Sequence, residues 1–143
     1  MFPKPIVGHV ISYAYLWQSE QVLGQEEGLK DRPCAVILLI AAEDDDQRVT
    51  VLPITHTPPV RPEFAIEIPS ATKRRLGLDD HRSWVILTEA NRFTWPGPDL
   101  RPTRRGEAPS VLYGELPANL LIKIRDAFIA LQSKHKAIVT RTE

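Results

Sequence analysis

The chain has 143 residues, 43% of them hydrophobic, and its 18 Lys and Arg residues balance its 18 Asp and Glu residues. This length favours one domain, residues 1–143, with one hydrophobic core, and a zero net charge is not the strongly basic balance of many nucleic-acid-binding domains. The longest apolar run, residues 34–42, is far shorter than the ~20 residues of a membrane-spanning helix, and the one cysteine excludes an internal disulfide. We therefore expect a cytoplasmic protein with no membrane span.

The first part of the chain predicts three strands. Residues 8–15 alternate well enough for a first strand, and the polar residues 16–31 predict a long loop. Residues 33–42 are rich in Val, Ile and Leu, which predicts a central strand. The acidic residues 43–47 predict a turn, and the alternation over residues 48–55 predicts the return strand of a hairpin.

Shorter elements follow, because 13 prolines against 7 glycines interrupt the chain. Residues 64–68 predict a strand, and residues 70–76 predict a short helix that Gly77 ends. Residues 84–88 and 91–94 predict two further strands.

The last part of the chain predicts a loop, a strand and a helix. Residues 96–109 have no apolar period and predict a mobile loop, and residues 111–113 predict a short strand. Residues 117–136 contain no internal Pro or Gly and repeat apolar residues at helical spacing, which predicts an amphipathic helix. Because no helices lie between the early strands, the fold class is mainly β with α: a small, bent antiparallel sheet and a C-terminal helix.

The sequence predicts no cofactor and no metal site. Neither phosphate-binding glycine motif occurs, and the four histidines lack the close spacing of helix-borne zinc ligands. Asp44, Asp45 and Asp46 could hold a cation, but the segment lacks the glycine and the final Glu of a calcium loop. The alternative is a solvated hairpin tip.

The predicted hairpin brings three polar residues to one rim of the sheet. With a turn near Asp45, antiparallel pairing places Arg32 beside Thr55 and His56. A guanidinium and a hydroxyl can donate to a phosphate, and a histidine can transfer a proton near neutral pH. These residues could therefore bind and cleave a phosphodiester, although polar residues at strand ends are also common without any function.

The residues around this rim resemble those of the MazF/PemK family of toxin endoribonucleases. The resemblance is carried by Gly28-Leu-Lys-Asp-Arg-Pro-Cys-Ala-Val-Ile37 and by Val49-Thr-Val-Leu-Pro-Ile-Thr55. The family has a glycine-containing loop before an Arg-Pro pair and an apolar strand, then a strand that ends in Ile-Thr. A weaker similarity continues through residues 64–68, 76–77 and 83–92 to the C-terminal helix.

The resemblance implies a small, twisted, SH3-like antiparallel β-barrel that forms a homodimer. Family members cut single-stranded RNA without a metal, by attack of the 2′-hydroxyl on the adjacent phosphate. Arg32 matches the catalytic arginine of the family and Thr55 its catalytic threonine, and Arg92 matches an arginine on a later strand. The implied partners are single-stranded RNA, a cognate antitoxin protein and operator DNA bound through that antitoxin.

Other residues extend this hypothesis. We expect His56 to act as general acid or base, because an arginine is a poor base at neutral pH. We expect Lys30, Arg92, Trp95 and Arg101 to bind RNA, since cations and exposed rings are the groups that single-strand binders use. The alternative for Trp95 is a place in the core. The alternative for Arg101, Arg104 and Arg105, which lie in the loop of residues 96–109, is that they keep this loop soluble.

Two functions follow from these residues. The first is a metal-independent endoribonuclease that acts as the growth-inhibiting toxin of a toxin–antitoxin pair. The second is a catalytically silent homodimeric module of the same fold that binds nucleic acid or a protein. The presence of both Arg32 and Thr55 favours the first.

The zero net charge averages two regions of opposite sign. Residues 20–46 contain eight acidic residues against two basic ones, whereas residues 73–105 contain eight basic residues against four acidic ones. A polarised surface of this kind predicts weak RNA binding on one face that decreases as salt increases.

Overall fold

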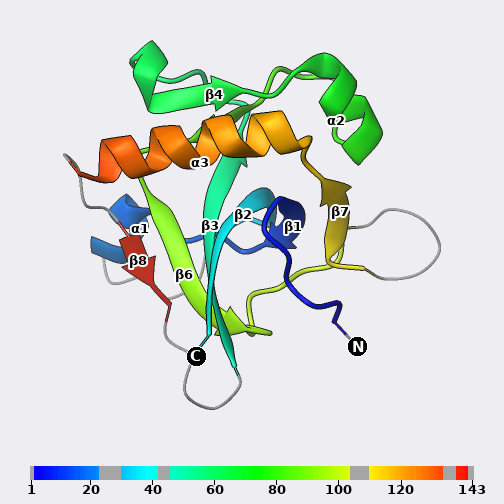
Figure 1. The fold of residues 1–143 in the computed structure, drawn as a ribbon, viewed down its shortest axis with the longest axis vertical. Helices are drawn as coiled ribbons and strands as arrows, with labels where there is room; N and C mark the ends of the chain where they lie inside the picture. Colours follow the sequence, from blue (N-terminus) through cyan, green and yellow to red (C-terminus); the bar gives the residue numbers. More distant parts are fainter. Residues whose placement is uncertain (1, 23–29, 42–45, 104–109, 134–137, 142–143) are drawn as a thin grey trace.

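The protein is an α+β fold in which one eight-stranded sheet carries three helices, described here from a computed structural model (Figure 1). The structure describes residues 2–22, 30–41, 46–103, 110–133 and 138–141. The strands are β1 (His9–Tyr13), β2 (Arg32–Ala41), β3 (Gln47–Thr55), β4 (Ala65–Glu67), β5 (Trp84–Ile86), β6 (Ala90–Trp95), β7 (Leu112–Glu115) and β8 (Ile138–Thr140). The helices are α1 (Gln18–Val22), α2 (Ser70–Leu76) and α3 (Ala118–Gln132), and a single 3₁₀ turn covers Pro62–Phe64.

The sheet follows the order β4-β5-β3-β2-β1-β7, and β6 joins it beside β3. All pairs are antiparallel except β6 with β8, which is parallel. On one side, β3 pairs with β6 from Gln47 to Val51 and then with β5 at Ile54 and Thr55. Pro53, which has no N–H to donate, stands at this change of partner.

The expected SH3-like closure of the sheet into a barrel is wrong for the described strands. The sheet branches at β3, and its end strands β4 and β7 each pair with one neighbour. The coarser expectation, a mainly β fold with a C-terminal helix, is confirmed.

Successive side chains of the strands point to opposite faces of the sheet and form two hydrophobic layers. Val10, Ala35 and Leu52 face the layer under α3, while their neighbours Ile11 and Val36 face the opposite layer. In the opposite layer the Tyr13 and Phe93 rings stack with centroids 4.4 Å apart. Helix α3 lies across the sheet (Figure 1) and buries Leu120, Ile124 and Phe128.

The two predicted helices that carry clear stop or period signals are confirmed. In α3 the buried residues recur every fourth position, as the apolar period predicted. Helix α2 ends at Gly77, which adopts the left-handed φ of 71° and donates its N–H to the Arg74 carbonyl at 3.1 Å. No helix within the described ranges is long and apolar enough to cross a membrane.

Two predicted loops contain more order than expected. Helix α1 lies within residues 16–31, where Glu20 accepts a hydrogen bond from the Trp17 N–H at 3.0 Å. Residues 96–103 run along β1, because Ala14 donates its N–H to the Asp99 carbonyl and Arg101 donates its N–H to the Ser12 carbonyl. Strand β8 was not predicted at all, and the proposed acidic tip at residues 43–45 lies outside the described residues.

Candidate functional site

A cleft of about 570 Å³ lies where β2 begins and β3 ends. Its lining combines cations, hydroxyls, a histidine and a carboxylate, chiefly Lys30, Arg32, Thr55, His56, Asp79 and Tyr113. The register of the hairpin differs by about three residues from a turn centred at Asp45, because Cys34 pairs with Pro53 and not with a residue near His56. The start of β2 therefore extends toward Thr55. The prediction that Arg32, Thr55 and His56 share one rim is nevertheless confirmed.

Thr55 presents its hydroxyl at the end of β3. Pairing with Trp84 of β5 fixes its backbone, and its Oγ1 accepts a hydrogen bond from the Thr57 N–H at 3.2 Å. Because the oxygen already accepts from the backbone, the hydroxyl proton is available as a donor.

Arg32 carries a positive charge that no carboxylate of the described residues pairs with. Its guanidinium lies over the Trp17 ring, 5.0 Å from the centroid, and its buried Nε has no hydrogen-bond partner in the described structure. Trp17 in turn meets the Tyr15 ring edge-on at 5.2 Å. This stack holds the cation at the cleft, where no carboxylate of the described part of the chain neutralises its charge, and such a cation can bind an anion.

A partly buried carboxylate supports the Trp17 side of this stack. Glu89 Oε1 accepts hydrogen bonds from the Tyr15 hydroxyl at 3.1 Å and from the Gln18 N–H at 2.9 Å. Burial raises the pKa of Glu89, and the nearby Glu20 charge adds to this, against the two hydrogen bonds. The folded chain therefore binds this proton more tightly than the unfolded chain, and stability falls as the pH rises from 4.5 through the raised pKa.

Glu89→Gln is accordingly expected to raise the melting temperature at neutral pH, because the amide keeps the accepting oxygen and removes the desolvated charge. The gain should vanish near pH ~3, below the ordinary pKa of Glu, where Glu89 is protonated in both states. Thermal unfolding across this range measures the effect. The matched control is Glu67→Gln, because Arg82 donates two hydrogen bonds to Glu67 and lowers its pKa, so no stabilisation is expected there. A Glu89→Gln variant less stable than the wild type at pH ~7 would contradict this account.

His56 is paired with a carboxylate that the sequence did not single out. Asp79 Oδ2 lies 2.7 Å from His56 Nε2, and both side chains are about half exposed. Asp79 follows α2, and the pairing of β5 with β3 brings this loop against Thr55. In the sequence, Asp79 is marked only by its place two residues after the helix-ending Gly77, and this place does not indicate a functional role.

Asp79 is held in its charged form. Burial raises its pKa, but hydrogen bonds from Lys73 and from the His81 N–H, together with the charge of His56, outweigh burial and leave the pKa below its ordinary value. At neutral pH Asp79 is therefore a carboxylate that only accepts hydrogen bonds.

Of the four predicted RNA-binding residues, Lys30 lines the cleft, and Arg92, Trp95 and Arg101 do not. Arg92 pairs with Thr50 and Thr140 in the middle of the sheet. Trp95 pairs with Gln47 at the opposite end of β3 from Thr55, and its Nε1 donates to the Pro3 carbonyl at 3.0 Å. The loop arginines Arg104 and Arg105 lie outside the described residues.

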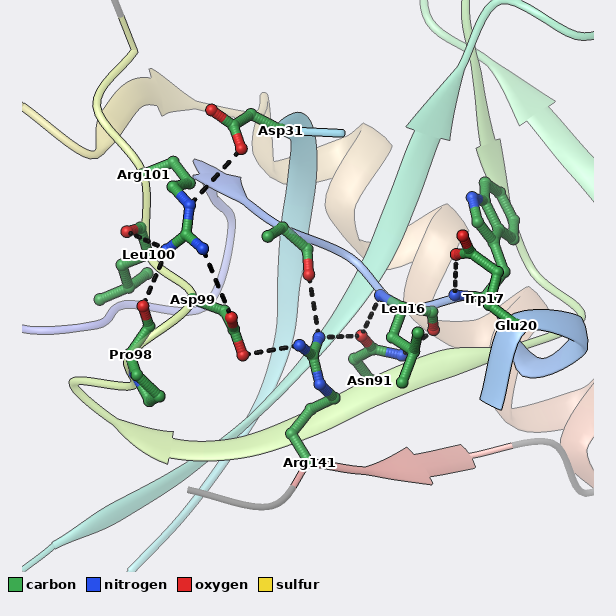
Figure 2. A network of polar contacts seen from close by, with 11 residues as sticks. Leu16, Trp17, Glu20, Asp31, Asn91, Pro98, Asp99, Leu100, Arg101 and Arg141 are labelled. Carbon is green, nitrogen blue, oxygen red and sulfur yellow. Dashed lines mark hydrogen bonds and ion pairs between the residues drawn. The ribbon is translucent and has the colours of Figure 1, made fainter. Parts of the chain in front are cut away.

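Arg101 lies beside the cleft but is engaged within the protein (Figure 2). Its Nη1 donates to the carbonyls of Pro98 and Leu100, and its guanidinium lies 3.6 Å from both Asp31 and Asp99. Since Asp31 lines the cleft, these contacts hold the rim rather than leave Arg101 free for a ligand.

Arg141 anchors the same network from below the loop (Figure 2). Its side chain is 1% exposed, and it donates to Asp99 Oδ2 at 2.6 Å and to the Ala14 carbonyl and Asn91 Oδ1 at 2.9 Å each. Asn91 also exchanges two hydrogen bonds with the backbone of Leu16, both at 2.8 Å. The network thus ties β8 to β6 and to the chain leaving β1.

No protein-family model matches the chain, and no curated protein matches it. Within the described ranges, no three His, Cys, Asp or Glu side chains group closely enough to hold a metal ion.

Proposed function

We propose that this chain is a metal-independent endoribonuclease that cleaves single-stranded RNA. The observation that carries the proposal is the shared cleft, which is lined by Arg32, by the donor hydroxyl of Thr55 and by the His56–Asp79 pair. Among the described residues no carboxylate pairs with the Arg32 cation. The likeness to MazF/PemK toxins at Arg32 and Thr55 supports the same conclusion.

Lys30, Arg32 and Thr55 supply the phosphate-binding groups. A guanidinium offers a planar fork of N–H donors that matches two phosphate oxygens, and the hydroxyl donates one further hydrogen bond. Charge on the non-bridging oxygens increases as the 2′-oxygen attacks. Donors already fixed toward that charge usually give the largest single contribution to the rate.

His56 supplies the proton transfer. It removes the proton from the 2′-hydroxyl while the 2′-oxygen forms its bond to the adjacent phosphorus and the bond from phosphorus to the 5′-oxygen breaks. The 5′-oxygen takes a proton from water, so the products are a 2′,3′-cyclic phosphate and a 5′-hydroxyl. Asp79 stabilises the imidazolium that forms and fixes the ring.

We further propose that the enzyme acts as the toxin of a toxin–antitoxin pair. The cleft cations Lys30 and Arg32 would attract an acidic, extended antitoxin segment, which would exclude RNA. A short acidic reading frame beside the gene would support this assignment.

The decisive experiment incubates the purified protein with mixed-sequence single-stranded RNA in excess EDTA and maps the ends. We expect cleavage that persists in EDTA and leaves 2′,3′-cyclic phosphate and 5′-hydroxyl ends. An RNA with 2′-deoxy sugars at the mapped sites is the matched control and should resist cleavage, because the attacking hydroxyl is gone. Cleavage of this control, or an inert wild type on varied RNA, would reject the mechanism, and the inert outcome would favour the silent binding module.

A further inference from the structure

Helix α2 buries a lysine beside the cleft. Lys73 is 5% exposed, whereas its neighbours Arg74 and Arg75 are exposed. Burying an ammonium group is costly unless it is paired and hydrogen-bonded. The hydrogen-bond partners of the Lys73 ammonium group therefore indicate its role.

Lys73 binds the loop that carries Asp79. Its Nζ donates to Asp79 Oδ1 at 3.0 Å and to the His81 carbonyl. The His81 N–H donates to the same Oδ1 at 3.0 Å. The Leu78 N–H also donates to the Lys73 carbonyl, so the helix end and the loop close around this one residue.

These contacts divide the two oxygens of Asp79 between separate tasks. Oδ1 takes the lysine and the backbone N–H, which leaves Oδ2 facing His56 Nε2 at 2.7 Å. Because an ionised carboxylate only accepts, Nε2 must carry the proton of a neutral His56 ring. The other ring nitrogen, Nδ1, then holds the lone pair.

We propose that Lys73 is a positioning residue that fixes Asp79 so that His56 keeps its proton on Nε2 and offers Nδ1 to the RNA 2′-hydroxyl. This inference rests on the proposed nuclease function and names the nitrogen through which the proton moves. Lys73 itself touches neither the cleft nor the substrate, since it is absent from the cleft lining.

The first test observes the tautomer without any RNA. Two-bond ¹H–¹⁵N spectra of the histidine rings identify a neutral ring by its ¹⁵N shifts and distinguish Nε2–H from Nδ1–H. We expect His56 as the Nε2–H form in the wild type, with His56→Gln assigning its signals. A wild-type His56 in the Nδ1–H form would overturn the proposal with no other variant needed.

The second test compares Lys73→Met with Lys73→Arg, and uses Arg74→Met on the exposed face of α2 as the matched control. Lys73→Met keeps the apolar stem and removes the donor, so kcat should fall at least ~10-fold while KM changes little. The whole contribution of a positioned base, ~10²–10⁴-fold, sets the upper limit of this loss. Its His56 signals should become a mixture of both tautomers. Lys73→Arg restores a donor and should recover most of kcat, while Arg74→Met should match the wild type.

The outcomes separate the two proposals. A wild type that fails to cleave RNA but shows the Nε2–H form rejects the nuclease function alone. A folded Lys73→Met variant with wild-type kcat, or with an unchanged tautomer, overturns the role of Lys73 alone. If Lys73→Met does not fold, a Lys73→Arg variant that folds but shows no preference for Nε2–H overturns it as well.

Discussion

Replacing Arg141 by Met is expected to lower the free energy of unfolding by about 3–5 kcal/mol, the range for breaking a buried ion pair by removing one partner. The substitution leaves the Asp99 carboxylate buried and without the donor that lies 2.6 Å away in the native protein. It also removes the N–H group that serves the Ala14 carbonyl and Asn91 Oδ1. Urea unfolding followed by tryptophan fluorescence measures the change.

Arg125→Met is the matched control, since Arg125 is 43% exposed and lies 3.7 Å from an exposed Asp126. An exposed pair of this kind contributes about 0–1 kcal/mol, so this variant should unfold close to the wild type. Adding Asp99→Asn to Arg141→Met should recover part of the loss, because the stranded charge is then removed. Equal losses for Arg141→Met and Arg125→Met would show that the buried network contributes little.

Replacing Arg32 by Ala is expected to reduce the rate of RNA cleavage by about 10²–10³-fold, as for loss of one fixed donor to a developing negative charge. Arg32→Lys keeps the charge but lacks the planar fork of donors, so its cleavage rate should lie between those of the wild type and Arg32→Ala. Initial rates on a short RNA substrate, with circular dichroism to verify the fold, measure the effect.

Arg82→Ala controls for loss of an arginine stacked on a ring. Arg82 lies 5.0 Å from the Trp84 ring centroid, as Arg32 does from Trp17, but it is paired with Glu67 through two hydrogen bonds of 2.7 Å. Cleavage by Arg82→Ala should remain near the wild-type rate. A loss as large as that of Arg32→Ala would mean that stacking and packing, rather than phosphate binding, explain the effect.

Local patterns predicted the elements that local forces determine. The Gly77 stop and the apolar repeat of residues 117–136 both reflect contacts within one or two helical turns, and both helices are present, the second ending at Gln132. The hairpin of β2 and β3 was predictable because its strands are adjacent in the chain, and it brought Arg32 to Thr55. The SH3-like barrel was implied by the family resemblance, and no local pattern shows whether a sheet closes on itself.

Partners distant in the chain were not predictable. Asp79 and His56 meet because β5 pairs with β3, and Arg141 reaches Asp99 because β8 adds in parallel to β6. A three-residue strand and a single arginine leave no period in the sequence to detect. Lys73 looked like one of three exposed cations on a short helix, since charge alone does not reveal burial.

The reach of Arg141 has a consequence for how the chain folds. Its hydrogen bond to the Ala14 carbonyl joins residues 127 positions apart, and β8 pairs with β6, which is synthesised well before it. Contacts of such long sequence separation form slowly, because a large loop must close before they stabilise the chain. In a nascent chain that has not reached residue 141, Asp99 lacks its hydrogen bond from Arg141 and keeps only the longer contact with Arg101, so the Arg101–Asp31 contact at the cleft rim is less well anchored. Maturation of the cleft is therefore expected to wait until Arg141 has been synthesised and has reached Asp99.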